Sequence, residues 1–263
     1  MGGRGASSSI AKAGALGSGA TLPPQADTTV QIDNTQVASA FSASYDAFMA
    51  MSDDDKADFI STNIKSGVPD HLADNSFQRF LYNSQISDKP DIVDDATLDT
   101  MTGTEIFRTV NYVDKRHNPK GYGYTAPQIA NQVMKGTDTR VSDTGGSVYG
   151  RGIYFADSYS HSTSRYGDTT GNVKATAVMR AKLNNNAKVI SSTKAKFGAR
   201  QEIASGSKLG KALARCDTDS QASIYAMSKG FNVISSGHGY YNILNRNAMT
   251  MSKDVKAKGS SWN

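Results

Sequence analysis

A glycine- and tyrosine-rich stretch holds most of the residues in this sequence whose types and spacing could do chemistry. It spans residues 145–167 and reads G-G-S-V-Y-G-R-G-I-Y-F-A-D-S-Y-S-H-S-T-S-R-Y-G. Glycine lets a ligand approach the main chain closely, while tyrosine rings and an arginine can hold a flat aromatic ring beside an anion. These residues predict one wall of a binding site. The alternative is a strand, a turn and a helix with ordinary packing tyrosines, because G-x-G alone is a weak signal.

The same stretch predicts the elements that would position these groups. Residues 153–155 are β-branched or aromatic, which favours a short buried strand. Asp157 or Ser158 then supplies a side-chain oxygen that can cap a helix running toward Tyr166.

The run G-R-G-I-Y-F-A-D at 150–157 resembles the NAD-binding signature of the ADP-ribosyltransferase superfamily, in the form shared by poly(ADP-ribose) polymerases and phage-encoded relatives. Those proteins continue with a serine-containing helix that ends in tyrosine. Further segments are similar to strands of phage-type members: T-E-I-F-R at 104–108 to the first, residues 180–190 to the middle strands, and Y-N-I-L-N-R at 241–246 to the closing strand. The resemblance covers residues 89–251.

The resemblance implies an α+β fold, in which an N-terminal helical segment precedes an ADP-ribosyltransferase-type split β-sandwich around an NAD cleft. NAD would be a substrate and no metal would take part. The bond from ribose to nicotinamide would break, and an acceptor nucleophile would take the ADP-ribose. The residues proposed for catalysis are Arg108, Tyr154, Tyr166, Tyr240 and Glu202. Those implied for NAD binding are Arg108, Thr109, Gly150, Gly152, Tyr154, Ser162 and Tyr166.

Arg108 has two interpretations. It lies in a strand-like run at 104–110, and a buried arginine needs an anionic partner. A ribose or phosphate of the dinucleotide would provide that contact, and a structural salt bridge is the alternative. Related proteins of the arginine type usually have glycine next, whereas Thr109 follows here.

The glutamate that stabilises charge in this family is missing from its usual place at the start of the closing strand. Residues 239–242 read G-Y-Y-N, and the chain has only two glutamates, Glu105 and Glu202. Glu202 would have to reach the site from a loop; otherwise it is a surface residue. Without the carboxylate, the resemblance favours transfer of a single ADP-ribose unit, or loss of activity, over polymer formation.

Two functions follow from this. The first is a mono-ADP-ribosyltransferase that modifies a host macromolecule, with a protein as the expected acceptor and a nucleic acid as the other acceptor class. The second is a phage virion or head-associated structural protein with a degenerate, inactive form of the fold. We expect the protein to work in the host cytoplasm, with carriage in the virion as a further expectation, and to have no membrane partner.

Composition and charge limit the classes of function. Residues 1–100 hold 6 Lys+Arg against 14 Asp+Glu, net −8, and residues 101–263 hold 23 against 10, net +13. The basic half suits a pyrophosphate or an acidic acceptor, and the alternative is that the two halves complement each other inside the protein. The single cysteine excludes an intramolecular disulfide. The four histidines lack metal-ligand spacing, and no apolar run is long enough to span a bilayer.

The chain divides into four predicted parts: a flexible tail at 1–34, a helical segment at 35–101, the ADP-ribosyltransferase-like domain at 102–252 and a basic tail at 253–263. We expect no signal peptide, because residues 1–26 lack an apolar centre. Helices are predicted to begin at Ser52, Asn75 and Asp94. Strands are predicted at 104–110, 173–183, 188–190, 231–235, 240–244 and 248–251, and a helix at 221–229 ended by Gly230. The basic run at 191–215 reads as a solvated helix face or loop, with acceptor phosphates as its alternative partner.

Overall fold

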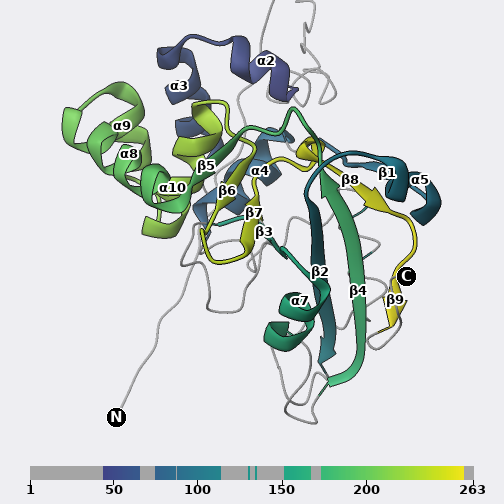
Figure 1. Ribbon diagram of the computed structural model, residues 1–263. Coiled ribbons are helices and arrows are strands. Elements are labelled where there is room, and N and C mark those ends of the chain that lie inside the picture. Colours follow the sequence, from purple (N-terminus) through teal and green to yellow (C-terminus); the bar gives the residue numbers. More distant parts are fainter. Residues whose placement is uncertain are drawn as a thin grey trace, which may run out of the picture.

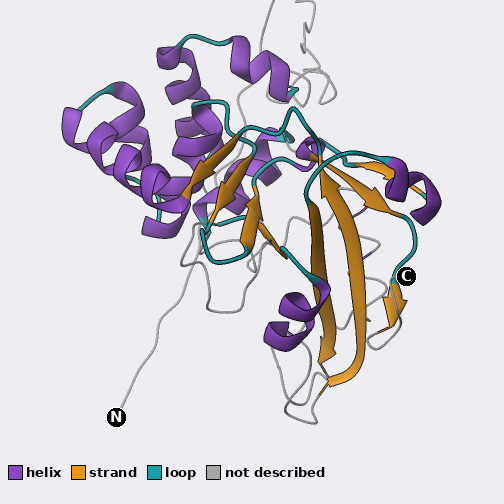
Figure 2. Ribbon diagram, viewed as in Figure 1, coloured by secondary structure: helices purple, strands orange, loops and turns teal. Residues whose placement is uncertain are grey.

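The computed structural model describes residues 44–65, 75–86, 88–113, 130, 134, 151–166 and 173–257. These residues form a mixed α+β structure in which helices gather beside a mixed, open sheet (Figures 1 and 2). The helices are α2 (Tyr45–Ala50), α3 (Asp53–Asn63), α4 (Ser76–Ser84), α5 (Asp95–Thr100), α7 (Tyr159–Tyr166), α8 (Ser192–Ser205), α9 (Lys208–Leu213), α10 (Thr218–Ser228) and the 3-10 turn η2 (Arg246–Ala248).

The strands form one sheet in the order β1-β8-β4-β2-β3-β7-β6-β5, with β9 also paired to β4. Their bounds are β1 (Asp91–Val93), β2 (Glu105–Val113), β3 (Ile153–Ala156), β4 (Val173–Leu183), β5 (Val189–Ser191), β6 (Val233–Ser235), β7 (Tyr240–Ile243), β8 (Met249–Ser252) and β9 (Lys256–Ala257). The β1–β8 and β5–β6 pairs are parallel, and the other pairs are antiparallel.

The sheet is almost divided in two between β2 and β3. These neighbours pair only at Phe107 and Ala156, whereas β2 and β4 pair along the full length of β2. Figure 1 shows the result: β2, β4 and β8 form one group of strands, and β3, β7, β6 and β5 form another. The two halves separate at the position of the glycine- and tyrosine-rich motif.

Both halves of the sheet contribute to one buried core. β2 and β4 supply Ile106, Val110 and Met179, while the other half supplies Phe155 and Ile243. Because side chains alternate along a strand, one face of each half is committed to this core. The opposite faces are free to meet helices.

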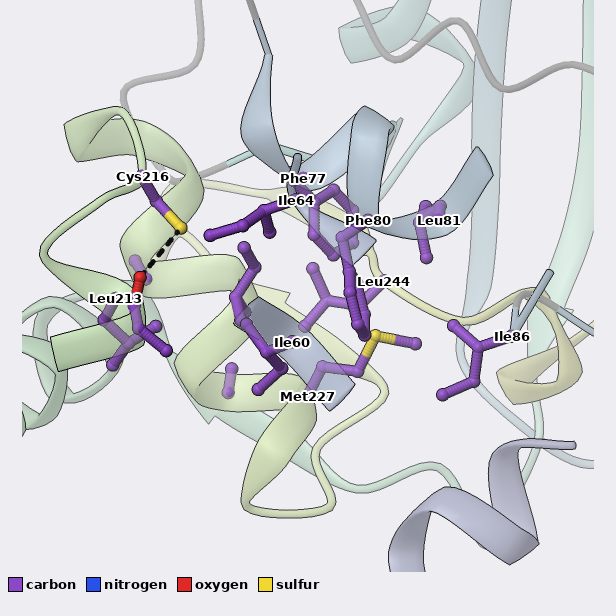
Figure 3. Packing of buried hydrophobic residues seen from close by; sticks show 14 of the residues in the cluster. Ile60, Ile64, Phe77, Phe80, Leu81, Ile86, Leu213, Cys216, Met227 and Leu244 are labelled. Carbon is purple, nitrogen blue, oxygen red and sulfur yellow. Dashed lines mark hydrogen bonds between the residues drawn. The ribbon is translucent and has the colours of Figure 1, made fainter. Parts of the chain in front are cut away.

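A second core joins the N-terminal helices to the C-terminal ones. Figure 3 shows Ile60, Phe77 and Phe80 from α3 and α4 packed against residues of α9 and α10. The centroids of the Phe48, Phe59 and Phe80 rings lie 5.5–6.1 Å from one another. The described helices α2, α3 and α4 of the segment predicted at 35–101 therefore share their core with α9, α10 and two strands of the sheet.

The predicted helix starts are confirmed by their caps. The side chains of Ser52, Asn75 and Asp94 accept hydrogen bonds from the main-chain N–H three residues later, at 3.1, 3.0 and 2.8 Å. A cap of this kind contributes about 1 kcal/mol. Strand β1 was not predicted.

Charge complementarity between the acidic and basic parts of the chain is visible at α3. Lys208 Nζ lies 2.6 Å from Asp58 Oδ2, and Lys229 Nζ lies 3.3 Å from Asp53 Oδ2. These pairs are exposed to solvent, so their contribution to stability is small. They show that acidic and basic residues of the two parts of the chain pair at the surface, where α3 meets α9 and the end of α10. Within the described ranges, no helix is long and apolar enough to cross a membrane.

Candidate functional site

Strand β3 places the motif beside the C-terminal strand β7. The two pair antiparallel from Ile153 opposite Ile243 to Ala156 opposite Tyr240. Ile153 and Phe155 point into the core that the sheet halves share. Alternation therefore directs Tyr154, which is only 6% exposed, to the other face, together with Tyr240.

Gly152 is needed for packing within the protein. A Cβ at this position would lie 1.7 Å from Oδ1 of Asn242 and 2.9 Å from the main-chain oxygen of Ile243. The amide of Asn242 thus occupies the space that a side chain would take. The close approach predicted for a ligand at Gly152 is, on this side, made by Asn242.

Arg151, between the two motif glycines, is tied to the start of α10. Its guanidinium lies 3.6 Å from Asp217 and 4.0 Å from Asp219. Its main-chain oxygen accepts hydrogen bonds from Ser223 Oγ at 2.6 Å and from Asn242 Nδ2 at 3.1 Å. The entry to β3 is therefore held in place by the helical part of the molecule.

Arg108 lies at the divide between the two halves of the sheet. Its neighbours Ile106 and Val110 point into the shared core, so Arg108 is on that face by alternation. The side chain is half-buried, and Nη1 donates to the main-chain oxygen of Tyr154 at 2.9 Å. β2 and β3 do not pair at Tyr154, and there the guanidinium of Arg108 provides a hydrogen bond between the two strands. The contact that the structure describes is with a carbonyl, on the face opposite the side chain of Tyr154.

Thr109 and Ser162 connect β2 to α7. Their hydroxyl groups lie 2.8 Å apart, and both residues are buried, with exposures of 6% and 1%. One turn away on the same helix, the ring of Tyr159 meets Phe107 edge-on at 6.1 Å. The face of β2 opposite the shared core is therefore covered by the helix that follows the motif.

The start of α7 brings an aspartate, a histidine and a tyrosine together. Nδ1 of His161 lies 3.0 Å from Oδ1 of Asp157, and its ring centroid lies 4.3 Å from that of Tyr240 on β7. An ionised carboxylate only accepts hydrogen bonds, so a neutral imidazole in this position donates from Nδ1 and has its lone pair on Nε2. The side chains of His161 and Asp157 are 31% and 46% exposed. This cluster combines a base with access to solvent.

Two predicted residues fall partly or wholly outside the described part of the chain. Tyr166 is the last residue of α7, but its side chain is not among those described. Gly150 lies outside the described residues altogether.

Glu202 is not brought to this group. It lies on α8, where Oε1 accepts from Ser207 Oγ at 2.6 Å and Oε2 lies 3.7 Å from Lys229 Nζ. The first contact supports the start of α9, because Ser207 caps that helix. Figure 1 shows α8 among the clustered helices, separated from α7 and the lower part of β2. Glu202 therefore connects α8 to the start of α9 and to the end of α10.

Sequence reasoning did not identify the pairing of Asp157 with His161. The signal was present, because residues four apart on a helix face each other. Asp157 or Ser158 was predicted to cap the helix, and Ser158 takes that role by accepting from His161 N at 3.2 Å. The contact of Asn242 with Gly152 was not predicted either, because no pattern in the neighbouring sequence indicates that these two distant residues meet.

Among the described residues, no cluster of three or more His, Cys, Asp or Glu side chains is arranged to hold a metal ion. No family model matches the chain, and comparisons with curated proteins and with solved structures yield no match either.

Proposed function

We propose that this protein transfers a single ADP-ribose unit from NAD to a host macromolecule, with protein as the acceptor. The observation that carries the proposal is the pairing of β3 with β7. It sets the run that resembles an NAD-binding signature directly beside the segment that resembles the family's closing strand. The hydrogen bond between Thr109 and Ser162 links the motif helix to β2, whose first residues belong to the segment at 104–108 that resembles the family's first strand.

The finer fold proposed is the split β-sandwich of that family. It is supported by the single pair of residues that joins β2 to β3 and by the core to which both halves contribute. In such an arrangement NAD would lie near the divide. Arg108 would then act mainly by holding Tyr154 and the end of β3 in position.

Transfer of one unit is favoured over polymer formation by the residue at the start of β7. Tyr240 stands there instead of a carboxylate, and Glu202 lies among the helices. A tyrosine ring can pack against a substrate, but at neutral pH its hydroxyl is a weak base. The site therefore lacks the glutamate that would activate a ribose hydroxyl for chain extension.

Binding of NAD is tested by thermal unfolding of the full chain. A ligand at 100 times its Kd adds about 2.7 kcal/mol to the free energy of unfolding, so millimolar NAD should raise the Tm measurably. NAD labelled in its adenylate phosphate is then incubated with the protein and host lysate. Label in protein supports the proposal, and label in RNA or DNA would move the acceptor to the nucleic-acid class.

Tyr154 offers a variant with a matched control. Tyr154→Ala removes the predicted stacking ring and should abolish labelling, whereas Tyr154→Phe keeps the ring and should retain labelling. Phe197→Ala alters an exposed residue of α8, 60% accessible, and should leave labelling unchanged. Labelling that persists in a folded Tyr154→Ala protein would show that the site lies elsewhere.

The alternative is a structural virion or head-associated protein that keeps the fold without the activity. It is favoured by the way the motif residues satisfy one another: Arg108 binds a carbonyl, Gly152 packs on Asn242, and Thr109 binds Ser162. No rise in Tm at millimolar NAD, with no label transferred, would favour this function.

A further inference from the structure

The turn before β7 is shaped around Asp157 and His161. A Cβ on Gly239 would lie 2.5 Å from Asp157 Oδ2 and 2.8 Å from His161 Nδ1, and Gly239 has a φ of +78°. Both the contact and the backbone angle favour glycine. In addition, Asp157 N donates to Gly239 O at 2.8 Å. The turn thus closes directly over the hydrogen bond between the carboxylate and the imidazole.

Tyr240 is held against this pair by the same turn. Ser236 Oγ accepts from Tyr240 N at 3.0 Å, and Ser236 N donates to Tyr240 O at 2.9 Å. On the other side, Tyr240 is paired with Ala156 of β3. With the main chain of Tyr240 fixed on both sides, its ring limits the orientations open to His161. An ordinary exposed aspartate–histidine pair on a helix has no such enclosure.

We propose that His161, oriented by Asp157, is the general base that takes the proton of the acceptor nucleophile in this transfer. This inference rests on the proposed function. In the neutral imidazole that donates from Nδ1 to this carboxylate, Nε2 is the nitrogen that would accept a proton from the acceptor nucleophile. Asp157 is a positioning residue, and Tyr240 packs against the base.

The step balances with NAD and the acceptor alone. The bond between the ribose C1′ and the nicotinamide nitrogen breaks, and its electron pair leaves with nicotinamide, which becomes neutral. The acceptor heteroatom bonds to C1′ and loses its proton to Nε2 of His161. The imidazolium formed is stabilised by the carboxylate of Asp157 at 3.0 Å and returns the proton to solvent. No oxidant, reductant or metal is required.

The test compares nicotinamide release with NAD binding. Purified full-length protein is incubated with host lysate and NAD labelled in the nicotinamide, and the rate of release is measured. General-base catalysis contributes about 10²–10⁴-fold, so His161→Ala should slow release by about 100-fold or more while the NAD-induced rise in Tm is retained. Asp157→Asn should also slow release with the Tm rise unchanged.

His161→Gln separates a catalytic role from a structural one. Glutamine can keep a hydrogen bond to Asp157 but accepts no proton, so this variant should be as slow as His161→Ala. Phe197→Ala, a change at an exposed residue of α8, serves as the control and should release nicotinamide at the wild-type rate.

Wild-type rates in His161→Ala or His161→Gln would overturn the inference alone, and so would loss of the NAD-induced Tm rise in His161→Ala. A wild-type protein that neither binds NAD nor releases nicotinamide would overturn the inference and the proposed function together.

Discussion

Replacing Gly152 by alanine should destabilise the protein strongly. The new methyl carbon would lie 1.7 Å from Asn242 Oδ1 and 2.6 Å from its Cγ, where ordinary contacts begin near 3.4 Å. Asn242 is 1% exposed, so its side chain has little room to turn away. Overpacking of this kind costs about 1–3 kcal/mol, and the nearby oxygen of Ile243 places the change at the upper end, about 3 kcal/mol. At about 2–4 °C per kcal/mol, the Tm should fall by about 10 °C.

A second substitution tests whether Asn242 is the cause. Asn242→Ala loses the bond from Nδ2 to the oxygen of Arg151, worth about 1 kcal/mol. It also removes Oδ1, a buried atom with no hydrogen-bond partner among the described residues. In Gly152→Ala/Asn242→Ala the new methyl fits into the vacated space, so the double variant should be about 2 kcal/mol more stable than the sum of the single changes predicts. Urea unfolding measures all four proteins. Additive effects, or a Gly152→Ala protein within about 0.5 kcal/mol of wild type, would refute the packing argument.

Two further predictions concern a buried hydroxyl pair and a partly buried carboxylate. Thr109→Val and Ser162→Ala each remove one member of a buried hydroxyl pair, so each should lower the free energy of unfolding by about 1–3 kcal/mol. The double variant should lose less than the sum of the two single losses. Additive losses in urea unfolding would show that the 2.8 Å contact contributes nothing. Asp217 should make stability sensitive to acid. Burial acts to raise its pKa, but hydrogen bonds from Ser220 and from Ser76 N, with the charge of Arg151, outweigh it and hold the pKa below its usual 3.8. The stabilisation is therefore present above pH 3.8 and lost as the pH falls through the lower, folded-state value. Asp217→Asn should unfold with a shallower acid dependence than wild type, and an identical pH profile would contradict this assignment.

Local patterns were sufficient for most of the elements. The caps at Ser52, Asn75 and Asp94 are carried by the residues themselves, and each helix begins where its cap predicted. The β-branched and aromatic run at 153–155 appears as β3, extended by one residue. Gly230 follows the last turn of α10 with a φ of +85°, an angle that glycine adopts readily. In each of these cases the determining atoms lie within a few residues of one another.

Long-range contacts explain what local patterns did not predict. β1 is three residues long, and it forms through parallel pairing with β8, far away in the sequence. Within the basic run on α8 and α9, the side chains of Lys194, Arg200 and Lys211 are exposed, as predicted for a solvated helix face. The sequence did not show that Ala195, Leu209 and Leu213 of the same helices enter the core shared with the N-terminal helices.

The candidate site shows the same division. Arg108, Thr109 and Ser162 could be selected as site residues from the sequence. The sequence did not show that Thr109 and Ser162 bond to each other, or that Arg108 bonds to a main-chain oxygen. Arg108 reaches a carbonyl because the sheet parts at β3, and no local pattern encodes that divide. The enclosure of His161 depends on Gly239 and Tyr240 folding back onto α7 from some 80 residues away.

Mass spectrometry of a host proteome incubated with the purified protein and NAD tests the central claim most directly. The account predicts host proteins that each carry single ADP-ribose units, and their absence when His161→Ala replaces the wild type. Chains of ADP-ribose would contradict transfer of one unit in the absence of a glutamate at the start of β7. A proteome with no ADP-ribose at all would contradict the assignment of this protein as a transferase.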